Sequence, residues 1–164
     1  MRWAWAGLLV AWAAGPVAAF SGVVTHVTDG DTLWVRADGA AAKAKPLKIR
    51  VQGIDAPERC QAWGPQAGEA LARRVLHRRV EVQTKARDDY HRSIARVSMQ
   101  GEDIGAWMVV QGHAWSDHWR RREGAYGALE AQARAARRGL FSQPDAIEPK
   151  VFRRMHGACV ASKH

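Results

Sequence analysis

Short segments that alternate apolar and polar residues make up much of the chain up to Met99, and turn residues separate them. Residues 20 to about 35 predict two strands around Asp29-Gly30, a dipeptide that favours tight turns. A stretch of small and polar residues leads from there to the next segment. The alternation predicts five strands in all, the last three over residues 46–51, 80–84 and 93–99.

Apolar residues recur at helical spacing in three other segments. The first follows Pro65, which suits the first turn of a helix, and the other two stop at Gly112 and Gly139, which suit helix ends. The chain beyond Phe141 shows little periodicity, so we expect an extended tail there unless a disulfide holds it. We predict helices over residues 66–78, 103–111 and 123–138.

Five strands with interposed helices indicate an α+β fold that is mainly β. The inventory suits a five-stranded barrel of the OB type, whose open face binds oligonucleotides, decorated by about three helices. About 145 residues remain once the apolar N-terminal run is set aside, which is the size of one compact domain. We expect residues 1–19 as a signal peptide, residues 20–142 as the barrel domain and residues 143–164 as a C-terminal tail.

The N-terminus has the composition of a secretory signal. Met1-Arg2 precedes an apolar run, which ends at Val17-Ala18-Ala19, where small residues suit a signal-peptidase site. An uncleaved membrane anchor is the alternative, but the run is shorter than the about 20 apolar residues that a spanning helix needs. We therefore expect a secreted or periplasmic monomer with no stable membrane association after signal cleavage.

Basic residues outnumber acidic ones, with 25 Lys and Arg against 16 Asp and Glu and a formal net charge of +9. This balance favours polyanionic partners such as nucleic acid. It fits equally a secreted protein that uses charge for solubility or for attraction to an anionic envelope. Charge alone therefore names no function.

The chain contains two cysteines, Cys60 and Cys159. In a protein expected to reach an oxidising compartment, a disulfide between them is the favoured interpretation. It would hold the C-terminal tail beside the loop that contains Glu58. Two free thiols are the alternative, and their wide spacing gives no metal-binding signature.

Two short stretches, residues 28–32 and 50–58, place carboxylates and an arginine at the ends of predicted strands. Side chains near strand ends can converge on one pocket. Hydrolysis of a phosphodiester needs a nucleophilic water, neutralisation of the nonbridging oxygens and help for the leaving alkoxide. Asp31 and Asp55 are hard oxygen donors that fit Ca²⁺, so the stretches indicate a metal-assisted site for phosphodiester cleavage. Turn formation and capping are the alternative for both residues.

Three motifs together carry a family resemblance. Asp-Gly-Asp-Thr at residues 29–32, Arg-x4-Asp-x-Pro-Glu at residues 50–58 and Tyr-His-Arg at residues 90–92 resemble, in order and spacing, the thermonuclease (staphylococcal nuclease-like) family. The resemblance covers about residues 20–142. It implies the same OB-type fold, action on both DNA and RNA, and 3′-phosphate products.

The resemblance also implies a metal-binding set. Asp31 and Asp55 would bind the metal together with the backbone carbonyl of Ala56. The family often has Thr at the position of Ala56, but the ligand there is a main-chain oxygen, so the departure is minor. Asp29 is expected to form the turn rather than to bind the metal directly.

Three further residues match the catalytic positions of the family. Glu58 corresponds to a carboxylate that activates or orients the attacking water, and a solvated Glu paired to Arg59 is the alternative. Arg50 and Arg92 match two arginines whose planar forks bind phosphate oxygens as charge builds in the transition state. For any single arginine in so basic a chain, a solvated surface position is the alternative.

Tyr90 and Trp115 are candidates for binding substrate, because aromatic faces stack on every base without reading sequence. Core packing is the alternative, above all for Trp115. The family usually has Gly where this chain has His91, which places the detailed loop conformation in question. His91 either contacts substrate or is an exposed loop residue.

These features predict a secreted Ca²⁺-dependent nuclease that hydrolyses DNA and RNA by attack of water on phosphorus. One rival is a noncatalytic OB-type nucleic-acid-binding protein that keeps the barrel and the basic surface. Another is a basic structural protein of the cell envelope. An active site that is no longer used for catalysis should have lost some of its catalytic residues. This chain keeps Asp31, Arg50, Asp55, Glu58 and Arg92.

Overall fold

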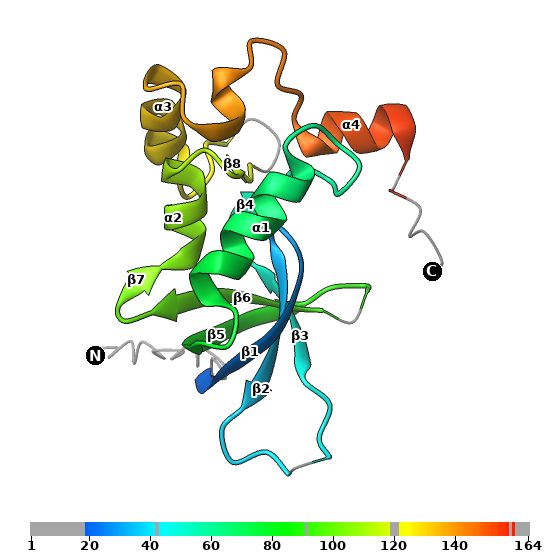
Figure 1. Ribbon diagram of the computed structural model, residues 1–164, viewed down its shortest axis with the longest axis vertical. Helices are drawn as coiled ribbons and strands as arrows, with labels where there is room; N and C mark the ends of the chain where they lie inside the picture. Colours follow the sequence, from blue (N-terminus) through cyan, green and yellow to red (C-terminus); the bar gives the residue numbers. More distant parts are fainter. Residues whose placement is uncertain (1–18, 42, 91, 119–121, 158, 160–164) are drawn as a thin grey trace, which may run out of the picture.

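A computed structural model describes residues 19–41, 43–90, 92–118, 122–157 and 159 (Figure 1). Except for Ala19, the predicted signal peptide lies outside the described residues, and so does His91. The helices within the described ranges are too short or too polar to cross a membrane.

Five strands form a closed mixed barrel, which confirms the predicted fold class. They are β1 (Ala19–Asp29), β2 (Thr32–Ala37), β3 (Leu47–Val51), β5 (Arg79–Arg87) and β6 (Ser93–Met99). Neighbours in the order β3-β2-β1-β5-β6 pair antiparallel, and a parallel pairing of β3 with β6 closes the barrel. Closure of the barrel explains why apolar and polar residues alternate along the strands, since one face of each strand lies inside the barrel.

Within the described residues, three two-residue strands were not predicted by the alternation, and Asp103 of one of them was expected to begin a helix. They are β4 (Ile54–Asp55), β7 (Glu102–Asp103) and β8 (Trp115–Ser116). The first pairs with the third, and β7 pairs with the end of β6. Such short strands have too few residues to show a period.

Within the described residues, four α-helices accompany the barrel, against the about three that were expected. They are α1 (Gly64–Val75), α2 (Ile104–Val110), α3 (Gly127–Ala135) and α4 (Pro149–His156), with a 3₁₀ turn at Gly139–Ser142. The third begins later than predicted because the Tyr126 N–H donates to Ser116 Oγ at 3.0 Å, which keeps the preceding residues in a loop.

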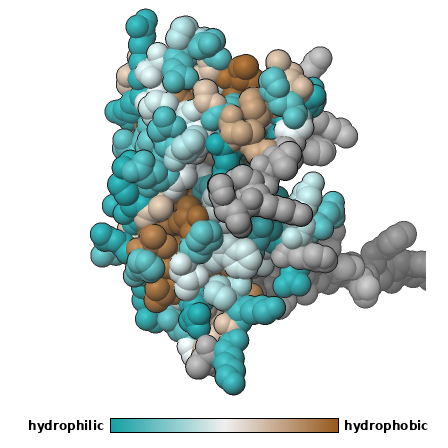
Figure 2. Space-filling model, turned by 45° about the vertical axis from the view of Figure 1, so that its right-hand side comes forward, coloured by the Kyte–Doolittle hydropathy of each residue, from teal (hydrophilic) through white to brown (hydrophobic). Residues whose placement is uncertain are grey.

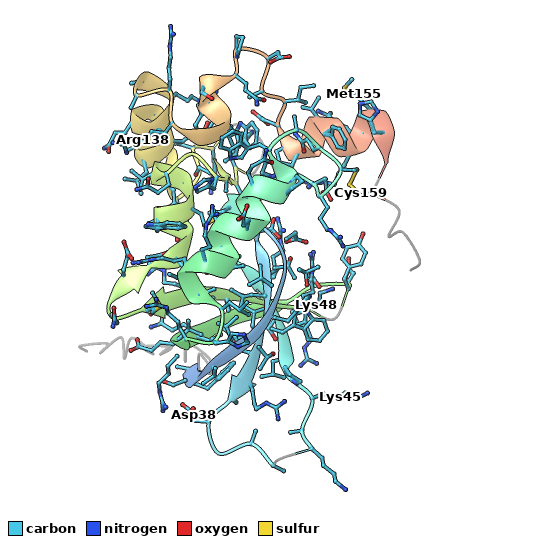
Figure 3. The ribbon with its side chains drawn as sticks, viewed as in Figure 1. Asp38, Lys45, Lys48, Arg138, Met155 and Cys159 are labelled. Atoms are coloured by element: carbon cyan, nitrogen blue, oxygen red, sulfur yellow. A yellow bond between two sulfur atoms is a disulfide. The ribbon has the colours of Figure 1, made fainter. Side chains whose placement is uncertain are left out.

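The C-terminal tail is not extended, which agrees with the expectation for a tail held by a disulfide, but the helix within it was not predicted. Helix α4 begins at Pro149, a residue suited to the first helical turn. The predicted disulfide is present, with Sγ atoms of Cys60 and Cys159 2.03 Å apart. Figure 1 shows α4 beside the loop that joins β4 to α1, and Figure 3 shows Cys159 just beyond the end of α4.

The apolar core fills the barrel and the space between the barrel and helices α1 and α2. Leu71 of α1 and Met108 of α2 are fully buried there. A smaller cluster lies between β8, α3 and the 3₁₀ turn, and it consists of Trp115, Ala133, Leu140 and Phe141. These packed elements fix the ends of β2, β3 and β4, which carry the candidate site.

Candidate active site

The turn between β1 and β2 positions the first carboxylate. Asp29 Oδ1 accepts a hydrogen bond from the Asp31 N–H at 3.1 Å, so Asp29 forms the turn. A Cβ at Gly30 would lie 2.7 Å from the Cβ of Ala56 and 2.8 Å from that of Ala67. Glycine is therefore needed for the turn to pack this closely. The packing leaves Asp31 only 5% exposed, next to Ala56.

Arg50 joins two carboxylates that come from different strands. Thr32 and Arg50 are paired across β2 and β3, which brings Arg50 beside Asp31. The chain then turns at Gly53, whose φ of +79° suits glycine, and returns with Asp55. Arg50 Nη1 donates to Asp31 Oδ2 at 2.5 Å, and Nη2 donates to Asp55 Oδ1 at 3.3 Å.

The electrostatics of this cluster follow from its burial. Burial alone would lower the pKa of Arg50, but the charges of Asp31 and Asp55 outweigh that effect and raise the pKa above its ordinary value. Burial, together with the charge of Asp31, raises the pKa of Asp29 to about 6. Its buried setting therefore favours the protonated form of Asp29 more than water does.

A loop between β5 and β6 carries the second predicted arginine. The Asp88 carboxylate accepts hydrogen bonds from the backbone N–H groups of Tyr90 and Arg92 and from Arg92 Nε, the last at 2.7 Å. Burial raises the pKa of Asp88, but these hydrogen bonds outweigh burial and lower it. The Arg92 guanidinium lies over the ring of Tyr90, 5.3 Å from the ring centroid. Asp88 thus holds both residues in place.

One cleft of about 420 Å³ gathers most of the predicted site residues. Figure 3 labels Lys48, which comes from β3 and lines the cleft together with residues from the loops around it. The face that Figure 2 brings forward is mostly hydrophilic, and its apolar residues occur in separate areas. A polar ligand suits such a surface. The cleft is lined by Asp29, Asp31, Lys48, Arg50, Ala56, Pro57, Glu58, Tyr90, Arg92 and Arg153.

Trp115 is not part of this cleft. Trp115 is only 4% exposed. Its ring packs edge to face against the ring of Phe141, and the two ring centroids are 5.6 Å apart. A base cannot stack on a ring that is covered in this way. The packing supports the alternative that Trp115 belongs to the core, so we do not retain it as a substrate-binding residue.

The sequence analysis missed two basic residues of the cleft, Lys48 and Arg153. Glu58 does not pair with Arg59, as its alternative role required. Instead Arg153 Nη1 donates to Glu58 Oε1 at 2.9 Å and to Asp55 Oδ1 at 3.1 Å. Arg153 Nη2 donates to Asp55 Oδ2 at 2.9 Å. The expected disulfide was the one signal that pointed to the tail, because it brings residues near Cys159 beside Glu58.

Comparison with known proteins agrees with this geometry. Residues 48–143, more than half of the chain, match the family model described as Staphylococcal nuclease homologue. The chain is 38% identical over 161 residues to Protein ParB of Escherichia coli, with 91% of this chain and 88% of that protein covered. It is 33% identical over 146 residues to the micrococcal nuclease of Shigella flexneri, with 82% and 81% covered.

A third relative is an uncharacterized endonuclease of Haemophilus influenzae, 34% identical over 131 residues, with 80% of this chain and 71% of that protein covered. The matched part of the chain contains the strands, turns and loops that bring Arg50, Glu58 and Arg92 to one cleft. It also contains Asp55, which accepts a hydrogen bond from Arg50. Barrel, cleft and relatives thus point to the same chemistry. This chain belongs to the staphylococcal nuclease family and is a nuclease of that family.

Proposed function

We propose that this nuclease uses Ca²⁺ to hydrolyse phosphodiester bonds of both DNA and RNA. The observation that carries the proposal is the convergence of Asp31 and Asp55 on one arginine, in a cleft that Glu58 and Arg92 also reach. This combination matches the requirements of phosphodiester hydrolysis. The reaction needs a group that orients or deprotonates the attacking water, and positive charges that neutralise the phosphate.

The donor atoms at this site fit a hard cation. Asp31 and Asp55 supply carboxylate oxygens that meet at one guanidinium, and the backbone carbonyl of Ala56 is the third donor that the family resemblance implies. Among the described residues, His, Cys, Asp and Glu form no group of three that could hold a metal. The protein would therefore supply a partial shell, and bound Ca²⁺ would supply an electrophile for the phosphate oxygens.

The residues of the chain would divide the remaining work. Glu58, half-buried at the cleft, would accept a proton from the attacking water or orient it. Arg50 and Arg92 would donate hydrogen bonds to the nonbridging oxygens, where charge grows as water adds to phosphorus. The bond from phosphorus to the 5′ oxygen would break, which leaves a 3′-phosphate. Tyr90, 78% exposed, would stack on a neighbouring base.

Incubation of the purified chain from residue 20 with single-stranded DNA and with RNA, in Ca²⁺ or in excess chelator, tests this function. We expect cleavage of both polymers only with Ca²⁺. Glu58→Gln should lower kcat by about 10²- to 10⁴-fold, the usual contribution of a general base. Glu81→Gln, on the exposed face of β5, is the matched control. If the chain binds both polymers but cleaves neither with any divalent ion, it is the noncatalytic binding protein instead.

We also propose that the protein is exported and works as a monomer. The apolar N-terminal run and the disulfide support export, because disulfides persist in oxidising compartments. N-terminal sequencing of the protein recovered from periplasm and medium checks this. A mature chain that begins at Phe20 supports it, and a chain that keeps Met1 in the membrane fraction contradicts it.

A further inference from the structure

Arg153 reaches the cleft from outside the segment that the family model matches. The family match ends at residue 143, whereas Arg153 lies on helix α4. Its two Nη atoms make three hydrogen bonds to the carboxylates of Asp55 and Glu58, at 2.9 to 3.1 Å. The side chain remains 38% exposed. It lines the same cleft as Arg50 and Arg92.

Two independent tethers hold helix α4 beside the cleft. The disulfide joins Cys159, just beyond the helix, to Cys60 in the loop that carries Glu58. Gln61, only 6% exposed, accepts the Glu58 N–H with Oε1 at 3.1 Å and donates from Nε2 to the Ile147 carbonyl at 2.6 Å. The same loop therefore carries Glu58 and anchors both ends of the segment that presents Arg153.

A guanidinium in this position would lose its Asp55 partner to a cation bound there, while its contact with Glu58 does not hold both of its Nη atoms. A divalent cation at Asp55 would compete with Arg153 for the same carboxylate oxygens. Substrate would at the same time bring phosphate oxygens, for which the planar fork of arginine is well suited. Because Arg153 is partly exposed, it can turn from the carboxylates to such a partner without leaving the cleft.

We propose that Arg153 is a third phosphate-binding arginine of this site, presented by the disulfide-tethered helix α4, which takes a phosphate of the nucleic acid next to the one being cleaved. The proposal rests on the proposed function for the polymer, for the cation at Asp55 and for the phosphate that Arg50 and Arg92 bind. Arg153 thus serves substrate binding, while Arg50 and Arg92 serve the reacting phosphate.

The test compares Arg153→Gln with Arg154→Gln, which removes the same charge from an exposed position on the same helix. With Ca²⁺ and a short single-stranded DNA, we expect Arg153→Gln to raise KM about tenfold or more, the effect of losing a charge-assisted hydrogen-bond pair. The value of kcat should change by less than about threefold. Arg153→Lys should fall between, because lysine keeps the charge but lacks the fork.

Binding without turnover provides a second readout. Fluorescence anisotropy with Ca²⁺ would compare Glu58→Gln with the double variant Glu58→Gln/Arg153→Gln. Loss of one phosphate contact should weaken binding and lower the slope of log Kd against log salt by about 0.7 for a single strand. Glu58→Gln/Arg154→Gln should change the affinity and the slope much less.

Removal of both cysteines, Cys60→Ser/Cys159→Ser, tests the route by which Arg153 is delivered. This variant should raise KM by less than Arg153→Gln does, because the contact of Gln61 with Ile147 remains, and the effects of the two changes should be less than additive in the combined variant. An unchanged KM and an unchanged salt slope in Arg153→Gln overturn the inference even if the wild type cleaves DNA well. Conversely, a wild type that does not cleave but loses DNA affinity on Arg153→Gln supports the inference and contradicts the nuclease function.

Discussion

Asp55 meets two arginines that reach it by different means. Arg50 comes from the barrel, five positions earlier in the chain, and pairing of β2 with β3 places it there. Arg153 comes from helix α4, 98 positions later, and a covalent bridge holds that helix. The Arg50 side chain is 20% exposed and the Arg153 side chain 38%. Arg50 is part of the barrel, whereas Arg153 lies on a helix that a disulfide attaches to the barrel domain.

The difference separates chemistry from substrate binding. The barrel part of the site is fixed by main-chain hydrogen bonds and core packing, so it needs nothing beyond the folded barrel. The tail part depends on one disulfide and on the contacts of Gln61. Changes in the barrel part should therefore abolish the reaction, whereas changes in the tail part should alter affinities and stability.

The largest effect is expected from Arg50→Ala. It removes the arginine assigned to the reacting phosphate and leaves Asp31 and Asp55 facing each other, so kcat should fall by about 10²- to 10³-fold or more. Single-turnover cleavage of single-stranded DNA measures this effect. Arg79→Ala, an exposed barrel arginine paired with Asp38, is the control and should keep near wild-type kcat. Equal cleavage rates for both variants would contradict the assignment of the chemical step to the barrel part of the site.

A smaller effect is expected from opening the disulfide. The bridge closes a loop with a sequence separation of 99, and its loss should lower the free energy of unfolding by about 2–5 kcal/mol. Urea denaturation of Cys60→Ser/Cys159→Ser and of reduced wild type measures the loss. The kcat should stay within about threefold of wild type, since the barrel part of the site is intact. A loss of kcat as large as that of Arg50→Ala would show that chemistry also depends on the tail.

Calcium affinity sharpens the comparison further. Arg153 occupies both oxygens of Asp55, so Arg153→Gln should tighten Ca²⁺ binding in the absence of DNA. The gain should be about five- to tenfold, corresponding to about 1 kcal/mol, because the ion pair is partly exposed. Isothermal titration calorimetry compares it with Arg154→Gln. Weaker Ca²⁺ binding in Arg153→Gln would mean that Arg153 orders the carboxylates rather than competing for them.

The smallest effect concerns the loss of stability at low pH, which should depend on His113 and not on the C-terminal tail. His113 Nδ1 accepts the Trp63 Nε1–H at 3.2 Å, and burial, together with the charge of Arg73, lowers the pKa of His113. The unfolded chain then binds the proton more readily, so this stability is complete above a pH of about 6.5 and is lost as pH falls toward the lowered pKa. Unfolding free energies at pH 7.5 and 5 should differ more in wild type than in His113→Gln.

The variant Cys60→Ser/Cys159→Ser is the control for this last effect. It should be less stable than wild type at both pH values but should show the same difference between them. If opening the disulfide removes the pH dependence, the acid sensitivity belongs to the tail rather than to His113.

The barrel part of the site was predictable from sequence because its signals are local. The Asp29-Gly30 turn, the strand alternation and the five-residue spacing from Arg50 to Asp55 are all visible in short stretches. The same pattern predicted the five barrel strands correctly, and the structure brings Glu58 and Arg92, which the family resemblance singled out, to one cleft. The structure also gives Asp29 the turn role that was expected.

The tail part was not predictable in the same way. Helix α4 is short, and its packing depends on Cys60 and Gln61, residues far away in sequence. No local pattern states that Arg153 faces Asp55 while Arg154 is exposed. The prediction that Trp115 binds substrate was wrong for a related reason. Its ring packs against Phe141, which lies beyond helix α3 and far away in sequence.

The central claim is that Asp31 and Asp55 support Ca²⁺-dependent phosphodiester cleavage beside Arg50. Its most direct test is a Ca²⁺ titration of DNA cleavage by wild type, Asp55→Asn and the control Asp38→Asn, an exposed residue in the turn after β2. We predict no cleavage in excess chelator, a wild-type response for Asp38→Asn, and at least about a tenfold higher Ca²⁺ requirement for Asp55→Asn. Cleavage that persists in chelator, or an unchanged Ca²⁺ response in Asp55→Asn, would contradict the claim.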